Sequence, residues 1–169
     1  MKDYIPHRYY RNIFDINYNK LKGDNIKCLL FDLDNTLAPV NVKTISDEYI
    51  DLFNELKKDF RVIIISNALP FRTKRFANML GVNYKCLAWK PHKFSYCKLI
   101  KKNGFKNDEV VTIGDQIFTD IKGAYNSGIK GILVDPISSV DSLFTKRNRK
   151  KENKYMNSSK LIRRGEYYE

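Results

Sequence analysis

The sequence contains few of the residues on which disulfide-rich and zinc-binding domains depend. Its 169 residues include three cysteines and two histidines. Cys28, Cys86 and Cys97 form no Cys-x-x-Cys pair, and three thiols cannot all pair with one another. We therefore expect free thiols in a reducing, cytoplasmic compartment, and we expect no zinc site.

Long hydrophobic runs and glycine-rich nucleotide loops are also missing. No stretch approaches the roughly 20 apolar residues that span a bilayer, and the first residues are mixed and charged, unlike a secretory leader. Neither Gly-x-x-x-x-Gly-Lys-Ser/Thr nor Gly-x-Gly-x-x-Gly occurs. The sequence therefore gives no indication of a nucleotide cradle.

Acidic residues are scarce relative to basic ones. The 31 Lys and Arg exceed the 19 Asp and Glu, which gives a formal net charge of +12. The bases concentrate in residues 85–107, which contain no acid, and in the tail from residue 141. Such a balance predicts an anionic partner, either nucleic acid, an acidic membrane surface or a phosphorylated substrate, although a solvated basic face is the alternative.

The middle of the chain alternates strand-like and helix-like segments. Short apolar runs predict buried strands at 26–32, 61–66, 82–88, 109–114 and 129–134. Apolar positions at helical spacing predict helices over 44–58, 70–80, 92–103 and 117–127. This alternation predicts a three-layer α/β fold with a parallel sheet.

The chain divides into three expected parts. Residues 1–25 are expected to form a helical segment packed on the core, residues 26–140 the α/β domain, and residues 141–169 a basic tail. In open parallel sheets, ligands bind beyond the carboxyl ends of the strands. The chemistry is therefore sought at the ends of the predicted strands.

Acidic side chains follow the first of these strands. Asp32 and Asp34 lie two residues apart, so in an extended segment they share a face and repel one another unless a cation lies between them. A turn built on aspartate and asparagine is the alternative interpretation. Thr36 follows in the same segment.

The other strand ends carry a complementary set of groups. Ser66 and Asn67 follow the second strand and could equally form a helix cap, and Lys90 follows the third and could equally be a solvated surface lysine. Asp115 and Asp120 follow the fourth strand. Several carboxylates with few histidines are typical of a Mg²⁺ site.

The order Asp-x-Asp-x-Thr, Ser-Asn, Lys-Pro and Gly-Asp-x-x-x-Thr-Asp resembles the haloacid dehalogenase (HAD) superfamily of aspartyl phosphotransferases. The frame Phe-Asp-Leu-Asp-Asn-Thr-Leu with Ile-Gly-Asp-Gln-x-x-Thr-Asp is similar to its YqeG branch of capless, subclass IIIA phosphatases. The likeness extends to residues 13–16 and to Thr-Lys-Arg-Asn-Arg at 145–149. Mitochondrial relatives of that branch dephosphorylate phosphatidylglycerophosphate.

The resemblance implies a role for each matching residue. Asp32 is the expected nucleophile and Asp34 the expected general acid and base. Mg²⁺ would be held by Asp32, Asp115 and the backbone carbonyl of Asp34, with Asp120 acting through water or on Lys90. The expected phosphate-binding and supporting residues are Ser66, Asn67, Lys90 and Thr36.

The spacing between the motifs leaves no room for a sizeable cap domain. The resemblance to the family, together with an open site and a basic surface, implies a phosphatidylglycerophosphate phosphatase at an anionic membrane surface, in the cytoplasm. A phosphatase of a soluble phosphometabolite or macromolecule is one alternative. The other is a non-enzymatic RNA- or ribosome-binding module, although no RNA motif is recognised and nucleic acid is the weaker expectation.

Overall fold

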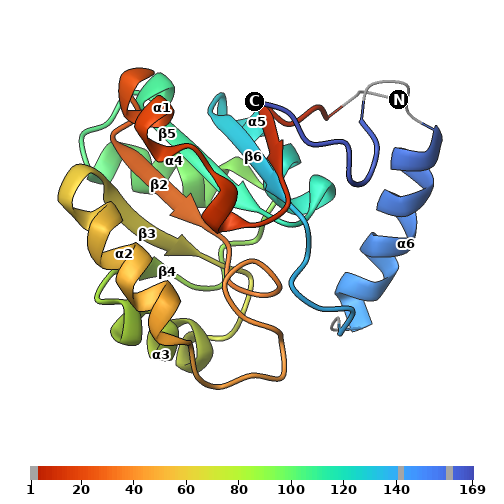
Figure 1. Cartoon of the computed structure of the whole chain (residues 1–169), viewed down its shortest axis with the longest axis horizontal. Coiled ribbons are helices and arrows are strands. Elements are labelled where there is room, and N and C mark those ends of the chain that lie inside the picture. The colour runs from red at the N-terminus through yellow and green to blue at the C-terminus, as the bar shows by residue number, and fades with distance from the viewer. Residues whose placement is uncertain (1–3, 141–142, 159–161) are drawn as a thin grey trace.

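A six-stranded parallel sheet forms the centre of the computed structural model, which describes residues 4–140, 143–158 and 162–169 (Figure 1). The strand order is β1-β6-β5-β2-β3-β4. The strands are β1 (Arg8–Tyr10), β2 (Cys28–Phe31), β3 (Arg61–Ile65), β4 (Asn83–Lys85), β5 (Val110–Gly114) and β6 (Lys130–Val134). The α/β fold with a parallel sheet is therefore confirmed, and no large cap is inserted between the described elements.

Helices connect the strands and cover the sheet. They are α1 (Tyr18–Gly23), α2 (Asp47–Asp59), α3 (Pro70–Leu80), α4 (Lys93–Lys102), α5 (Lys122–Ser127) and α6 (Leu143–Ser158). Short 3₁₀ turns lie at Ile13–Asp15 and Asn107–Glu109, and a π-helical turn at Ile117–Ile121 precedes α5. The predicted helix over 117–127 therefore begins with a wider turn than the periodicity indicated.

Alternate residues of β2 divide the core between the two faces of the sheet. Leu29 and Phe31 pack in one apolar cluster with side chains of α2 and α3. Cys28 and Leu30 pack in a second cluster with side chains of α4 and α5. Because successive side chains of a strand point to opposite faces, a central strand must be apolar throughout, as β2 is.

Both ends of the described chain meet at the sheet edge formed by β1. This strand was not predicted from the sequence, because three residues give too little periodicity. Its Tyr9 exchanges backbone hydrogen bonds with Tyr168, at 2.8 and 2.9 Å. The pairing covers part of an edge that would otherwise present free backbone groups.

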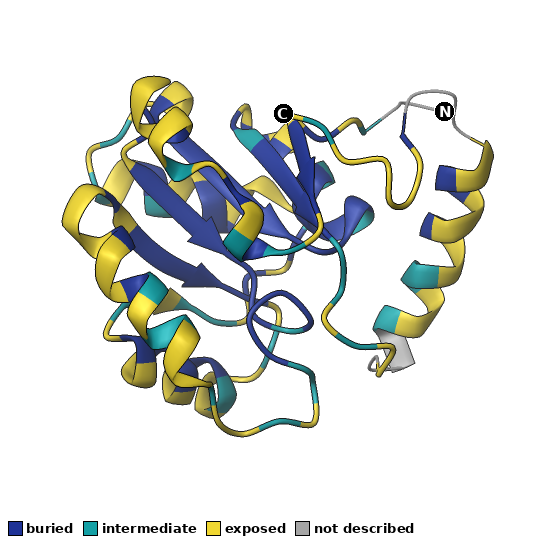
Figure 2. Cartoon of the chain, in the orientation of Figure 1, coloured by how far each residue is buried: buried dark blue, intermediate teal, exposed yellow. Residues whose placement is uncertain are grey.

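Helix α6 lies beyond the end of the sheet that β1 and β6 form, and it packs against the π-helical turn (Figure 1). Its Tyr155 and Met156 are buried in a third apolar cluster that also contains Ile117 and Ile121. Figure 2 shows that the buried residues of α6 face the body of the molecule and that its outer side is exposed. Within the described residues, no helix is long and apolar enough to cross a membrane.

Candidate active site

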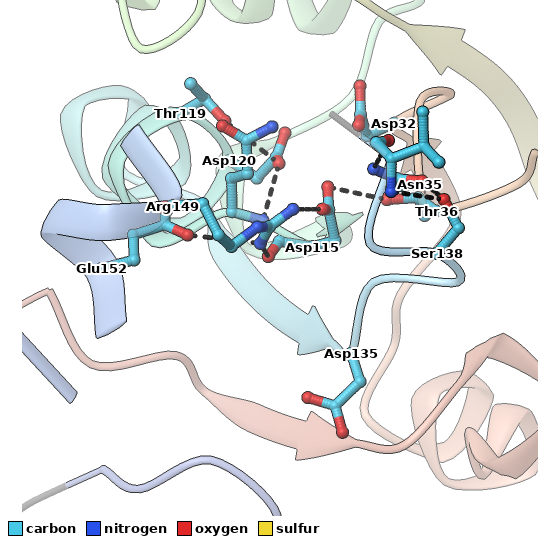
Figure 3. Close-up of polar contacts among 12 residues, drawn as sticks. Asp32, Asn35, Thr36, Asp115, Thr119, Asp120, Asp135, Ser138, Arg149 and Glu152 are labelled. Carbon is cyan, nitrogen blue, oxygen red and sulfur yellow. Dashed lines mark hydrogen bonds and ion pairs between the residues drawn. The ribbon is translucent and has the colours of Figure 1, made fainter. Parts of the chain in front are cut away.

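The loop after β2 carries the first two acids. Asp32 continues the sheet, because its N–H donates to the carbonyl of Ile113 at 2.8 Å. Asn35 then turns the chain with a φ of 63°, a left-handed conformation that asparagine tolerates better than most residues. Its side-chain amide donates to the carbonyl of Val140 at 3.0 Å and its oxygen accepts from Ser138 at 3.2 Å, which ties this loop to the segment after β6 (Figure 3).

Lys90 is the buried cation of the site. Its Nζ donates to Asp32 Oδ1 at 2.5 Å and to Asp120 Oδ1 at 2.6 Å. The Asn67 side chain holds the lysine backbone from both sides, accepting from its N–H at 2.8 Å and donating to its carbonyl at 3.2 Å. Asn67 thus positions the backbone of Lys90, and the two carboxylates position its ammonium group.

Asp120 is delivered by the π-helical turn. The Ile121 N–H reaches back to the carbonyl of Gln116 at 3.3 Å, the i to i−5 bond that widens the turn. The Asp120 carboxylate accepts from the Gln116 N–H at 3.3 Å and from the Thr119 hydroxyl at 3.2 Å. A Cβ at Gly114 would lie 2.3 Å from the Asp120 Cγ, so glycine is required there.

Three carboxylates converge in this buried region. One oxygen from each of Asp32, Asp115 and Asp120 lies within 4.8 Å of the others. Asp115 also lies 3.4 Å from the Thr36 hydroxyl, which donates to its Oδ1 (Figure 3). Carboxylates packed this closely suit a hard divalent cation such as Mg²⁺, so the donor set fits the predicted metal.

Burial sets the electrostatics of these groups. It raises the pKa of Asp32, and it raises that of Asp115 to about 6, because a charged carboxylate is poorly solvated there. Lys90 opposes the shift at Asp32, and Arg149 opposes it at Asp115. Although burial alone would lower it, Asp120 and Asp32 raise the pKa of Lys90, so the lysine stays charged.

Asp34 lies apart from the carboxylate cluster. Its Oδ1 accepts from Arg72 Nε at 2.7 Å, and the two remaining guanidinium nitrogens donate to the carbonyls of Val42 at 2.6 Å and Pro39 at 2.9 Å. Arg72 was not predicted from the sequence. It is one of many basic residues, and only the folded loop brings it to Asp34.

Arg149 of α6 also reaches the site, and the sequence indicated it only as part of a family segment. Its guanidinium donates to the Asp115 carbonyl at 2.9 Å and to the Asp115 carboxylate (Figure 3). It also contacts Glu152, 3.3 Å away on the same helix, whose other oxygen accepts from the Phe118 N–H at 3.0 Å. Glu152 is fully buried, and burial raises its pKa to about 7.

A cavity of about 540 Å³ opens over these groups. Five of the predicted residues line it, namely Asp32, Asp34, Ser66, Asn67 and Lys90. Thr36, Asp115 and Asp120 lie behind its wall and are buried. Leu69 and Trp89 line it as well, and α6 contributes Thr145 and Asn148. The structure therefore brings the predicted set to one place.

Comparisons with known proteins agree with this arrangement. Residues 1–79 match the family described as mitochondrial PGP phosphatase, and residues 88–137 match a HAD-hydrolase-like family. The chain is 34% identical to the "Probable phosphatase YqeG" of Bacillus subtilis over 160 residues, which cover 94% of this chain and 93% of that protein.

Solved structures share the fold. One is the cobalt-bound deoxy-D-mannose-octulosonate 8-phosphate phosphatase of Haemophilus influenzae, with a TM-score of 0.53, 20% identity and coverage of 76% of this chain and 77% of that one. Another is a predicted HAD-like hydrolase of Porphyromonas gingivalis, with a TM-score of 0.54, 16% identity and coverage of 73% and 98%. The identity to the Bacillus protein over nearly the whole length, together with the two family matches, shows that the chain belongs to the YqeG family of the HAD superfamily.

Proposed function

We propose that this protein is a Mg²⁺-dependent phosphomonoester hydrolase that works through an aspartyl-phosphate on Asp32. The observation that carries the proposal is that Asp32 and Lys90 line one open cavity and converge there with two further aspartates that are buried behind its wall. The "Probable phosphatase" of Bacillus, to which the chain is similar, and the cobalt-bound phosphatase of Haemophilus, which shares the fold, support it.

In the first step, a carboxylate oxygen of Asp32 forms a bond to phosphorus while the bond to the leaving alcohol oxygen breaks. Asp34 lines the same cavity and supplies the proton that this oxygen takes up. In the second step, the oxygen of a water molecule forms a bond to phosphorus while the bond from phosphorus to the Asp32 oxygen breaks. Asp34 accepts a proton from the water, which leaves the free Asp32 carboxylate and inorganic phosphate. Arg72 holds Asp34 over the cavity during both steps.

Other residues hold the phosphoryl group. Lys90 and Ser66 stand at the ends of neighbouring loops and would bind its oxygens, where negative charge must be stabilised. Bound Mg²⁺, held by Asp32, Asp115 and Asp120, would neutralise the repulsion between an anionic nucleophile and an anionic substrate. Asn67 keeps Lys90 in register through its backbone.

The Asp32→Asn variant tests the reaction. We expect it to lose Mg²⁺-dependent hydrolysis of p-nitrophenyl phosphate while keeping the wild-type circular dichroism spectrum. Asp51→Asn, an exposed change of the same kind on α2, serves as the matched control and should keep full turnover. Full Mg²⁺-dependent turnover by Asp32→Asn would refute the proposal.

For the physiological substrate we propose phosphatidylglycerophosphate, met at a cytoplasmic, anionic membrane surface. The match of residues 1–79 to the mitochondrial PGP phosphatase family supports this choice. The three free cysteines suit the cytoplasm. An open cavity without a cap also suits a phosphate that is anchored in a surface.

An exposed apolar rim beside the cavity adds support. It consists of Leu69 and Trp89, which line the cavity with 57% and 73% of their surfaces exposed. The hydrogen bonds between Asn67 and Lys90 join the two loops that carry Leu69 and Trp89. Exposed aromatic side chains beside basic segments are typical of proteins that lie on a membrane.

Trp89 is the only tryptophan, so its fluorescence reports directly on this rim. We expect a blue shift of its emission with vesicles that contain anionic lipid and none with neutral vesicles. Leu69→Ser should weaken this binding, whereas Met79→Ser, an exposed change at the other end of α3, should not.

A substrate panel with Mg²⁺ completes the test. It compares phosphatidylglycerophosphate in micelles with sugar phosphates and nucleotides. Turnover of soluble substrates alone, with no vesicle binding, would overturn the lipid proposal and favour a phosphometabolite. Salt-sensitive RNA binding that survives Asp32→Asn, without any turnover, would favour the binding module.

A further inference from the structure

A second hollow, of about 470 Å³, continues from the active-site cavity. Asn67, Lys90, Thr119 and Asn148 line both spaces, so the two adjoin where the transferring phosphate would be held. Beyond this boundary the second hollow is lined by Pro91, Phe118, Lys122 and Lys151. We call it the Lys122 hollow.

The Lys122 hollow is positively charged and has no carboxylate in its lining. Lys122 is the first residue of α5 and Lys151 comes from α6, so two elements far apart in sequence bring like charges to one place. Within the described part of the chain, neither lysine forms an ion pair with a carboxylate. The one described contact of the Lys122 Nζ is with the Tyr4 ring, 5.3 Å from its centroid.

The active-site cavity differs in this respect. Its lysine, Lys90, is already neutralised by Asp32 and Asp120. The two lysines of the Lys122 hollow have no such carboxylate partner among the described residues, so they are available to an anionic ligand from outside the chain. An anion bound in the Lys122 hollow would be attracted by both positive charges and could accept hydrogen bonds from both ammonium groups.

We propose that the Lys122 hollow binds a second anionic group of the substrate, so that the preferred substrate is a phosphomonoester with a further phosphate or phosphodiester in its leaving group. This inference rests on the proposed function, because the first phosphate is taken to lie at Asp32 and Lys90. Asn148, which faces both spaces, can donate to the connecting part of the substrate. Phe118 and Pro91 give that part an apolar wall.

The test compares propane-1,3-diol bisphosphate with its monophosphate, each with Mg²⁺. The wild type should prefer the bisphosphate in kcat/KM. Lys122→Gln and Lys151→Gln should each lower that preference about tenfold, mainly through KM, because each variant loses a charge-assisted hydrogen bond to the second anionic group. Lys150→Gln, an exposed neighbour on α6 that lines neither space, should keep the wild-type preference.

A binding measurement separates this site from turnover. Calorimetry on Asp32→Asn should give weaker bisphosphate binding when Lys122→Gln is added. Phosphatidylglycerophosphate in micelles is tested in parallel. If Lys122→Gln lowers kcat/KM for both the bisphosphate and the lipid, the hollow binds any second phosphate. If the variant lowers kcat/KM for the lipid alone, the hollow binds the phosphodiester of a lipid.

Two results would count against the proposals in different ways. If the wild type had the same kcat/KM for the bisphosphate, the monophosphate and the lipid, the second-anion site alone would be overturned. The same holds if Lys122→Gln and Lys150→Gln lowered the preference for the bisphosphate equally. Absence of turnover of every phosphomonoester by the wild type with Mg²⁺ would overturn the proposed function.

Discussion

Replacing Arg149 by glutamine should strengthen the binding of a divalent cation at the acidic cluster. In the structure, the Arg149 guanidinium donates to the carboxylate of Asp115, one of the three carboxylates proposed to hold the metal (Figure 3). Asp115 is fully buried, and the arginine is its main source of neutralising charge, with a smaller contribution from Lys90. A cation that takes this oxygen must displace the arginine from it.

The size of the effect follows from the bond that is given up. A hydrogen bond to a charged group contributes about 1.5–3 kcal/mol. Losing it on metal binding lowers the affinity by about 10- to 150-fold, since each 1.4 kcal/mol is a factor of ten. Glutamine can still donate to the Asp115 carbonyl, but it brings no positive charge. The variant should therefore bind Mg²⁺ at least about tenfold more tightly than the wild type.

Arg149→Gln should also lower the free energy of unfolding of the protein when no metal is bound. Removing one partner of a buried ion pair costs about 3–5 kcal/mol. The loss should be smaller below pH 6, because burial raises the pKa of Asp115 to about 6 and the carboxyl can then protonate. Mg²⁺ should restore more stability to Arg149→Gln than to the wild type, since a tenfold lower Kd adds about 1.4 kcal/mol at saturation.

Calorimetric titration with Mg²⁺ and thermal unfolding with and without the ion measure these effects. Arg147→Gln is the matched control, because Arg147 is exposed on the same helix and the substitution changes the net charge equally. Mg²⁺ affinity in Arg149→Gln that is equal to or below that of Arg147→Gln would refute the reasoning. Arg149 would then support the bound cation instead of competing with it.

Three further changes test other parts of the site. Arg72→Gln should lower kcat by about 10²-fold or more with little change in KM, because Asp34 loses its anchor, and Arg72→Lys should restore part of the rate; an unchanged kcat would contradict this. Gly114→Ala should destabilise the fold by about 1–3 kcal/mol and abolish stabilisation by Mg²⁺, because its Cβ would overlap Asp120. Burial raises the pKa of Glu152 to about 7, so this group makes the wild type less stable as the pH rises from about 4.5 to that value. Glu152→Gln should reduce this slope in urea unfolding at pH 5 and 8, and an unaltered slope would assign it to other groups.

The sequence predicted the central part of the fold and the convergence of the motif residues for one physical reason. Parallel strands place their carboxyl ends at one edge, so residues that follow β2, β3 and β5 must lie close together whatever the loops do. Asp32, Ser66 and Asp115 each follow such a strand directly. Their types and positions along the chain were therefore enough to predict one site.

Arg72 and Glu152 could not be predicted in this way. Arg72 lies in the first turn of α3, and nothing in its neighbourhood distinguishes it from Lys74 or Arg75. Its role arises because the loop after β2 folds back to offer two carbonyls and a carboxylate. Glu152 lies in a strongly polar stretch, and its burial depends on how α6 docks on Phe118. Contacts between distant segments leave no local signal in the sequence.

The tail shows why net charge alone was an incomplete guide. In a helix of 3.6 residues per turn, one face of α6 carries Thr145, Asn148, Arg149, Glu152, Tyr155 and Met156. The cavity, the acidic cluster and the third apolar cluster each contact part of this face. Lys146, Arg147 and Lys150 are exposed. Arg149 thus enters the acidic cluster, while its basic neighbours give the outer surface of α6 a positive charge. The basic run looks uniform in the sequence, but the helix divides it between these two faces.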